Sequence, residues 1–322
     1  MRKRPERDLP PSRENRRARQ RRSRAGAPSL ETLFPDSGTV GSLEWLQRPD
    51  VHHGPLERLG ALAEIDEIAD FRRWPRTRDL VITAVLERGR VHRRMPVDTF
   101  QAARLYGVGA TLTFESAHRW HPTLSQWIHA FAGELGVPEK ACSCNVYVSP
   151  AGCGVSKHFD NHHEITAQVI GTKRWSIAPN EHLANPLETC VVMAGVPRWT
   201  ARHSAGRISR KMPRGADQVV MRPGSTVSIP IGYWHSTQAI EPSVSITFGV
   251  APPTWLELAG DAIVGRLTEN ADWREPAWGM VGTPSQRAAA RKRLASLLAG
   301  LTRNLGRLSA SAIVGPAPDR PE

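Results

Sequence analysis

The chain has 322 residues, of which 40% are hydrophobic and 23% are charged, and this is ordinary for a globular protein. The sequence contains no apolar run that approaches the roughly 18–20 residues of a membrane helix, and its N-terminus lacks the apolar stretch of a signal peptide. Four cysteines are too few for a disulfide scaffold in a chain of this length, so we expect reduced thiols in a cytoplasmic protein.

The net charge of +12 is concentrated at the N-terminus, where residues 1–25 hold 11 lysines and arginines against three acidic residues. A segment so charged and so poor in apolar residues cannot pack, and we predict that residues 1–28 form a disordered basic tail. Two roles stay open for this tail. It keeps the protein in solution, or it contacts RNA, DNA or a ribosome-like surface by neutralising phosphates.

Helices are predicted in the first third of the chain after the tail. Residues 29–55 are typical of short helices broken by glycine and proline, with Ser29 and Ser42 as caps. Residues 56–74 indicate a further helical stretch. Two segments rich in valine, isoleucine and threonine are predicted strands, at 79–87 and 110–116.

One longer amphipathic helix is predicted over residues 121–137. Its apolar residues recur with the 3.6-residue period of a helix, and they are Leu124, Trp127, Ile128, Phe131 and Leu135. We expect the helix to end near Gly136 and Pro138, because these residue types do not continue a helix.

From residue 145 to 250 the pattern changes to short strands separated by turns, and this favours a sandwich or barrel. The predicted strands are 145–149, 164–170, 174–178, 190–196, 218–222, 226–230 and 243–250. Beyond them, residues 285–308 place leucines on one face and arginines on the others, which predicts an amphipathic helix. We expect that face to pack on its own domain or on a second copy of the chain in a homodimer.

The segment SKHFDNHHEI (156–165) gathers three histidines and two acidic residues. In a strand, side chains two residues apart share a face, so His158 and Asp160 point the same way. A second segment, RPGSTVSIPIGYWHSTQ (222–238), predicts a strand and a tight bend at Gly232 that delivers His235. Two histidines and one carboxylate on neighbouring strands form a facial triad with open coordination positions, which is the pattern of non-haem Fe(II) oxygenases.

A lysine follows the first pair of predicted ligands. The strand that begins at residue 164 runs to Ile170, Gly171 and Thr172 turn the chain, and Lys173 opens a return strand, which we interpret as a hairpin. An ammonium group in an apolar barrel requires an anion. The dicarboxylate 2-oxoglutarate meets this need, since one end chelates iron while the distal carboxylate pairs with the lysine.

These residues together resemble a known family. The arrangement N-x-Y-x-S-P, H-F-D, Q-x-x-G-x-K-R-W, P-G-S and I-P-x-G-x-W-H is similar to that of the JmjC-type cupin-4 oxygenases, which include ribosomal-protein hydroxylases. The resemblance covers about 143–250 and extends more weakly to residues 43–55. It implies that the iron ligands are His158, Asp160 and His235. It also implies that the residues contacting 2-oxoglutarate are Lys173, Asn145, Tyr147 and Thr247.

The sequence departs from the family at two places. The family usually has an acidic residue and then aromatic or apolar positions where this chain has NHHEITA (161–167), and the stretch before His158 is one residue shorter. These departures bear on the substrate more than on the metal. His162 and His163 are alternative ligands or pocket residues, and the paired thiols of Cys142 and Cys144 are expected to be buried.

The expected fold is mainly β with helical flanks, around a double-stranded β-helix of the cupin/JmjC type. We expect three parts: the tail (1–28), the oxygenase domain (29–255, with its core at about 110–255) and a C-terminal helical region (256–322). The expected reaction is Fe(II)- and 2-oxoglutarate-dependent hydroxylation of an amino-acid side chain in a protein or peptide, or of a small metabolite. Three alternatives stay open: an N-methyl-lysine demethylase of the same fold, a metal-binding cupin that does not use 2-oxoglutarate, and a nucleic-acid-binding scaffold.

Overall fold

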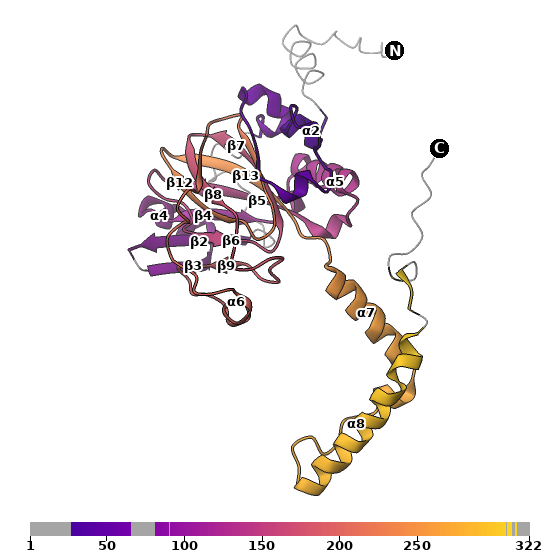
Figure 1. The fold of residues 1–322 in the computed structure, drawn as a ribbon. Helices are drawn as coiled ribbons and strands as arrows, with labels where there is room; N and C mark the ends of the chain where they lie inside the picture. The colour runs from indigo at the N-terminus through magenta and orange to yellow at the C-terminus, as the bar shows by residue number, and fades with distance from the viewer. Residues whose placement is uncertain (1–26, 66–80, 90, 307, 311–312, 314–322) are drawn as a thin grey trace, which may run out of the picture. The chain divides into compact units, whose positions relative to one another are not determined.

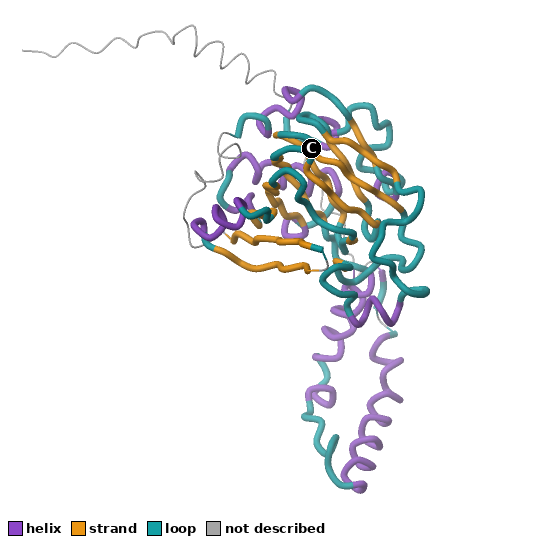
Figure 2. The backbone as a smooth tube through the Cα atoms, turned by 90° about the vertical axis from the view of Figure 1, so that its left-hand side faces the viewer, coloured by secondary structure: helices purple, strands orange, loops and turns teal. Residues whose placement is uncertain are grey.

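The computed structural model describes the chain except residues 1–26, 66–80, 90, 307, 311–312 and 314–322. The predicted basic tail and the second half of the predicted 56–74 helix therefore lie outside the described residues. The chain forms two compact units, Met1–Pro252 and Pro253–Glu322. Figure 2 shows the strands gathered in the first unit and the helices of the second unit.

An eight-stranded antiparallel sheet forms one wall of the first unit, in the order β1-β11-β7-β13-β5-β4-β2-β3 (Figure 1). Its strands are β1 (Asp50–His52), β2 (Val81–Arg88), β3 (Val91–Val97), β4 (Thr111–Glu115), β5 (Cys142–Ser149), β7 (His163–Ile170), β11 (Thr226–Ile229) and β13 (Ser243–Val250). Strand β13 lies at the centre and is buried along its whole length, because it pairs with β5 on one side and β7 on the other.

A five-stranded antiparallel sheet, in the order β10-β8-β12-β6-β9, forms the second wall. Its strands are β6 (His158–Phe159), β8 (Lys173–Ala178), β9 (Cys190–Val191), β10 (Asp217–Met221) and β12 (Trp234–Ala239). From β5 to β8 and from β10 to β13, consecutive strands alternate between the two sheets, and this is the arrangement of a double-stranded β-helix. The predicted fold class, mainly β with helical flanks around such a core, is confirmed.

The hairpin predicted from Gly171-Thr172 is wrong. Strand β7 pairs with β11 and β13, whereas β8 pairs with β10 and β12 in the other sheet. Gly171 has a φ of 63°, and a Cβ atom there would lie 2.1 Å from the carbonyl oxygen of Pro242. The glycine thus allows a close backbone approach at the crossover, rather than the two-residue turn of a hairpin.

Helices of the first unit pack against strands of the larger sheet. The predicted amphipathic helix is α5 (Pro122–Leu135), which ends at Gly136 in the left-handed conformation, with a φ of 64°. Its Phe131 ring lies 4.9 Å from that of Phe248 on β13, in an edge-to-face contact. The remaining helices of this unit are α2 (Leu30–Leu33), η1 (Trp45–Gln47), η2 (Leu56–Leu62), α4 (Thr99–Gly107), η4 (Ala117–Arg119), η5 (Glu139–Ala141) and α6 (Arg198–His203).

Local sequence signals account for several of these boundaries. The Ser29 hydroxyl accepts a hydrogen bond from the N–H of Thr32, as expected of a cap. Asp98 and Gln101 form a reciprocal capping box at the start of α4. The strand β3 was not predicted, because its sequence VHRRMPV is largely polar and lies at the sheet edge.

The second unit consists of α7 (Trp255–Thr268), η6 (Ala271–Arg274) and α8 (Pro284–Leu305). Helix α7 begins with a capping box between Thr254 and Glu257. Helix α8 corresponds to the leucine-striped helix predicted over 285–308. No described helix combines the length and the apolar character needed to cross a membrane.

Candidate metal centre

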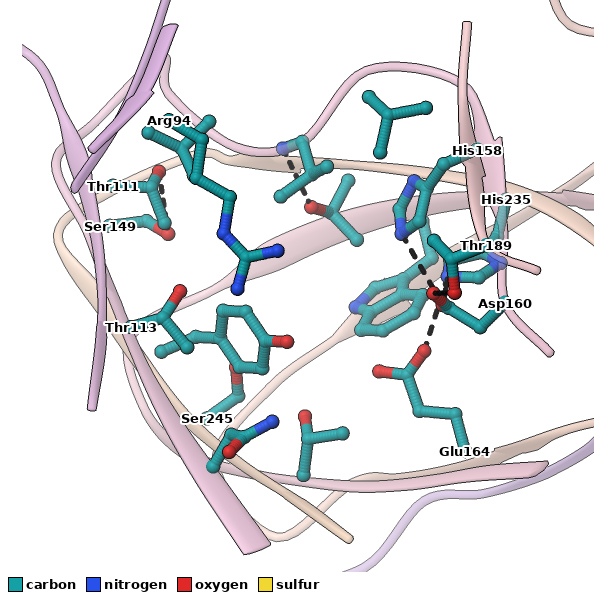
Figure 3. A pocket seen from close by; sticks show the side chains of 18 of the residues that line it. Arg94, Thr111, Thr113, Ser149, His158, Asp160, Glu164, Thr189, His235 and Ser245 are labelled. Carbon is teal, nitrogen blue, oxygen red and sulfur yellow. Dashed lines mark hydrogen bonds and ion pairs between the residues drawn. The ribbon is translucent and has the colours of Figure 1, made fainter. Parts of the chain in front are cut away.

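The three predicted ligands meet between the two sheets. His158 and His235 lie opposite each other on the paired strands β6 and β12, with ring centroids 3.9 Å apart. Asp160 follows β6, and its Oδ2 lies 3.8 Å from Nε2 of His158 and 3.4 Å from Nε2 of His235. Figure 3 shows the three side chains converging at one end of a pocket.

The bend at Gly232 positions this group. Gly232 has a φ of 83°, and its N–H donates a hydrogen bond of 2.9 Å to the carbonyl oxygen of Asp160. The turn that leads to His235 is thereby tied to the loop that carries the carboxylate. A side chain at this position would be strained, since only glycine readily adopts a positive φ.

Each ligand side chain is oriented by a hydrogen bond on its far side. Nδ1 of His158 donates to the carbonyl oxygen of Ser156 at 2.8 Å, and Nδ1 of His235 donates to that of Tyr233 at 3.0 Å. Both rings therefore carry a proton on Nδ1 and direct Nε2 inward, where the neutral ring can bind a metal. The Thr189 hydroxyl donates to Oδ1 of Asp160 at 3.0 Å, which leaves Oδ2 facing the two histidines.

The electrostatics of the group favour a cation. Nε2 of His235 is buried without a well-aligned hydrogen-bond partner, although two carboxylate oxygens lie within 3.4 Å. Burial by itself lowers the pKa of His235, but Asp160 and Glu164 together raise it to about 10. Burial likewise opposes ionisation of Asp160, yet the neighbouring histidines hold its pKa well below the usual range. One divalent cation bound by all three side chains would satisfy these atoms.

The ligand atoms of His158, Asp160 and His235 all lie within 4.8 Å of one another. Two imidazole nitrogens and one carboxylate oxygen on one side of a point fit a divalent transition metal with open positions on the other side. The residues present therefore fit the iron centre that the sequence predicts.

The same pocket contains every residue predicted to contact a co-substrate, namely Lys173, Asn145, Tyr147 and Thr247. Lys173 begins β8 and is only 3% exposed. Its ammonium donates a hydrogen bond of 2.9 Å to the Ser245 hydroxyl. Burial lowers the pKa of Lys173 to about 8, and the charge of Glu164 only partly offsets this effect.

The other three predicted residues come from the larger sheet. Asn145 on β5 pairs in register with Thr247 on β13. Asn145 Oδ1 accepts a hydrogen bond from the N–H of Ser116 at 3.0 Å, which fixes the amide. Burial, and the charges of Glu164 and Asp160, raise the pKa of Tyr147, so its phenol stays protonated and can donate a hydrogen bond into the pocket.

Three residues that the prediction left without a role also line the pocket, and they are Glu164, Arg94 and Thr189. Glu164 is 7% exposed, and its Oε2 lies 3.1 Å from Nε2 of His235. The two-residue repeat of a strand could have predicted this position of Glu164, because every second residue of β7 points to the same face, and these residues are Glu164, Thr166 and Gln168. Arg94 could not be found this way, since its strand was not predicted.

The adjacent residues His162 and His163 have different surroundings. His162 lines the pocket, whereas Nε2 of His163 lies 2.7 Å from the Ser228 hydroxyl and does not line it. Neither belongs to the group of potential metal ligands. Cys142 and Cys144 are buried free thiols, as predicted.

A double-stranded β-helix with helical flanks is the fold of the cupin and JmjC class of proteins. Residues 135–258 match the family model of the JmjC domain. This match confirms, over these residues, the resemblance to JmjC-type cupins seen in the sequence.

The chain is similar to an uncharacterized protein, YxbC, of Bacillus subtilis (strain 168), with 26% identity over 239 residues that cover 72% of each chain. Among solved structures it is similar to YcfD, a ribosomal oxygenase from Escherichia coli, in complex with cobalt and succinic acid. There the identity is 17%, the TM-score is 0.50, and the match covers 84% of this chain and 68% of YcfD. The complex of YcfD with cobalt and 2-oxoglutarate gives 17% identity, a TM-score of 0.49 and the same coverage.

Proposed function

We propose that the protein is an Fe(II)- and 2-oxoglutarate-dependent oxygenase that hydroxylates a side chain of a protein or peptide. One observation carries the proposal: the three candidate ligands and the buried ammonium of Lys173 share one pocket. Among the described residues Lys173 forms no ion pair, although it is almost fully buried. A buried ammonium with a hydroxyl as its partner supports the binding of an anion.

The roles of the residues follow from their contacts. His158, Asp160 and His235 would hold the iron, and Lys173 with Ser245 would bind the distal carboxylate of 2-oxoglutarate. Iron, when bound, supplies the redox chemistry that couples hydroxylation to the conversion of 2-oxoglutarate into succinate and carbon dioxide. The protein orients both partners and limits the access of water, because most of the pocket side chains are buried or half-buried.

A protein substrate is supported by two observations. The similar YcfD is described as a ribosomal oxygenase. In this chain, the segment between β9 and β10 (192–216) contains six exposed cations and no acidic residue, and the cations are Arg198, Arg202, Arg207, Arg210, Lys211 and Arg214. Such a segment suits a polyanionic partner such as a ribonucleoprotein.

This basic segment is anchored beside the candidate metal centre. Lys157, which precedes the ligand His158, donates from Nζ to the carbonyl oxygen of Ser209 at 3.1 Å and lies 3.9 Å from the ring centroid of Trp234. A partner bound to the basic segment would be held close to the strand β6. We expect binding of a short single-stranded RNA to weaken as salt rises, and removal of residues 1–28 will show how much the tail adds.

We also propose that the C-terminal unit mediates self-association. Its helices and their connection expose large apolar side chains, among them Trp255 (77% exposed), Trp278 (78%) and Val281 (96%). Apolar exposure of this extent is typical of an interface. Light scattering of the full chain and of Trp255→Ser will test it, since a monomeric wild type would reject the homodimer. The four free cysteines support a reducing, cytoplasmic location.

The function is tested by 2-oxoglutarate turnover. The iron-loaded full chain is incubated with 2-oxoglutarate and either ribosomes or ribosomal-protein peptides, and succinate release and substrate mass are measured. We expect substrate-dependent succinate and a gain of one oxygen atom on the substrate. Formaldehyde and the loss of a methyl group would instead support the demethylase. No succinate under any condition would support a cupin that does not use 2-oxoglutarate.

A further inference from the structure

Glu164 is a buried carboxylate in the pocket for which the proposed reaction has no role. It lies on β7, in the segment where this sequence departs from the family pattern, and it is 7% exposed. Figure 3 shows its side chain reaching from the lower wall of the pocket toward Asp160 and His235. Within the described part of the chain, no lysine or arginine forms an ion pair with Glu164. Among the described residues its ion-pair partner is His235, itself a candidate metal ligand. When His235 is neutral and binds a metal, this buried carboxylate needs the charge of the metal in its place.

The distances place this carboxylate among the candidate ligands. Oε2 of Glu164 lies 3.1 Å from Nε2 of His235, whereas Oδ2 of Asp160 lies 3.4 Å from the same nitrogen. Two atoms bound at right angles to a metal, at bond lengths of about 2.0–2.2 Å, lie about 3 Å apart. The Glu164 oxygen therefore occupies the place of a neighbouring ligand to His235.

The outer carboxylate oxygen of Glu164, like that of Asp160, accepts a hydrogen bond from a threonine hydroxyl. The Thr166 hydroxyl donates to Oε1 of Glu164 at 2.9 Å, and Thr247 lies 2.7 Å from Thr166. This chain of hydroxyls orients the carboxylate and leaves Oε2 turned toward His235. In the same way, Thr189 binds Oδ1 of Asp160 and leaves Oδ2 inward. Hydrogen bonds of this kind are typical of carboxylates that bind a metal.

We propose that Glu164 is a fourth, displaceable protein ligand of the metal. Two carboxylates and two neutral histidines balance the charge of one divalent cation. Glu164 is the weaker ligand, because it does not belong to the group in which all ligand atoms lie within 4.8 Å of one another. The second part of the inference rests on the proposed function. The three stronger ligands take three of six positions, a chelating co-substrate takes two and oxygen takes one, so Glu164 must leave before all of them can bind. We place this step at the binding of 2-oxoglutarate, because the incoming anion repels the carboxylate of Glu164.

The test uses Co²⁺ as the probe with the full-length, metal-free protein. The dissociation constant for Co²⁺ is measured for the wild type, Glu164→Ala, Glu164→Gln and the control Glu181→Gln, which removes the same charge from an exposed site. Binding of 2-oxoglutarate to each cobalt-loaded protein is then measured by calorimetry. Thermal unfolding of each metal-free variant checks its fold, and Glu164→Gln preserves the side-chain shape if Glu164→Ala does not fold.

Opposite changes in the two affinities are the expected result. Loss of the ligand should weaken Co²⁺ binding about 10- to 100-fold. Loss of the competing carboxylate should strengthen 2-oxoglutarate binding at least about tenfold. The control should change neither. Unchanged Co²⁺ affinity in both Glu164 variants would overturn the proposal, and weaker 2-oxoglutarate binding in them would show that the carboxylate is not displaced. If 2-oxoglutarate binds neither the wild type nor any variant, while the Co²⁺ affinity of the Glu164 variants falls as expected, the role of Glu164 as a fourth ligand is supported and the proposed co-substrate is rejected.

Discussion

Replacement of Lys173 by alanine should weaken 2-oxoglutarate binding while leaving metal binding near normal. Lys173 is 3% exposed, and its ammonium has the Ser245 hydroxyl as its hydrogen-bond partner at 2.9 Å. Its carboxylate partner in the complex would also be buried. Removal of one member of a buried ion pair leaves the other without a partner, and this costs about 3–5 kcal/mol.

The lowered pKa of Lys173 leads to an energy of similar size. Burial lowers the pKa of Lys173 from 10.5 to about 8. One pKa unit corresponds to about 1.4 kcal/mol, so the charged form is destabilised by about 3 kcal/mol in the pocket. A bound carboxylate would recover energy of this order. Both routes predict a loss of about 10²–10³-fold in 2-oxoglutarate affinity.

The assay is a pair of titrations, one with the metal and one with 2-oxoglutarate, on the wild type, Lys173→Ala and Lys173→Arg. Arginine keeps the charge but changes the geometry, so it should retain part of the affinity. Lys211→Ala serves as the control, since it removes a lysine that is exposed. Equal 2-oxoglutarate affinity in the wild type and Lys173→Ala would refute the reasoning and favour a cupin that does not use 2-oxoglutarate.

Further predictions concern the metal, the pH and the fold. His235→Ala and Asp160→Ala should each lose more than about 100-fold in Co²⁺ affinity, since a ligand itself is removed; stoichiometric tight binding would reject the centre. The affinity for 2-oxoglutarate should be constant below pH 8 and fall above it. In the free protein Lys173, with its pKa lowered to about 8, loses its charge above that pH, whereas the bound anion favours the charged ammonium. A flat affinity profile up to pH 10 would contradict this. Gly171→Ala should lower the free energy of unfolding in urea by more than about 2 kcal/mol. Gly171 has a φ of 63°, and a Cβ there would lie 2.1 Å from a backbone oxygen. The control Gly133→Ala in α5, where a Cβ meets nothing within 4 Å, should stabilise by about 0.5–1 kcal/mol, and equal effects of the two would show that the crossover tolerates a side chain.

The amino-acid sequence alone predicted the ligands and much of the local structure. The spacing of His158 and Asp160 places two side chains on one face, and the bend at Gly232 before His235 can be recognised in one segment. The helix α5 was predicted from a 3.6-residue period and a terminal glycine. Each of these features depends on residues within about fifteen positions of one another. Patterns of that length can be recognised in the sequence without knowledge of the tertiary structure.

Only the tertiary structure decided which strands pair and which side chains share the pocket. The Gly-Thr turn before Lys173 suits a hairpin as well as a crossover between sheets, and the outcome depends on β10, β11, β12 and β13, which are distant in the chain. The approach of Glu164 to His235 joins residues 71 positions apart, and Lys173 meets Ser245 across 72 positions. Contacts between residues so far apart follow from the packing of the two sheets, because only burial of both inner faces brings these side chains to one place.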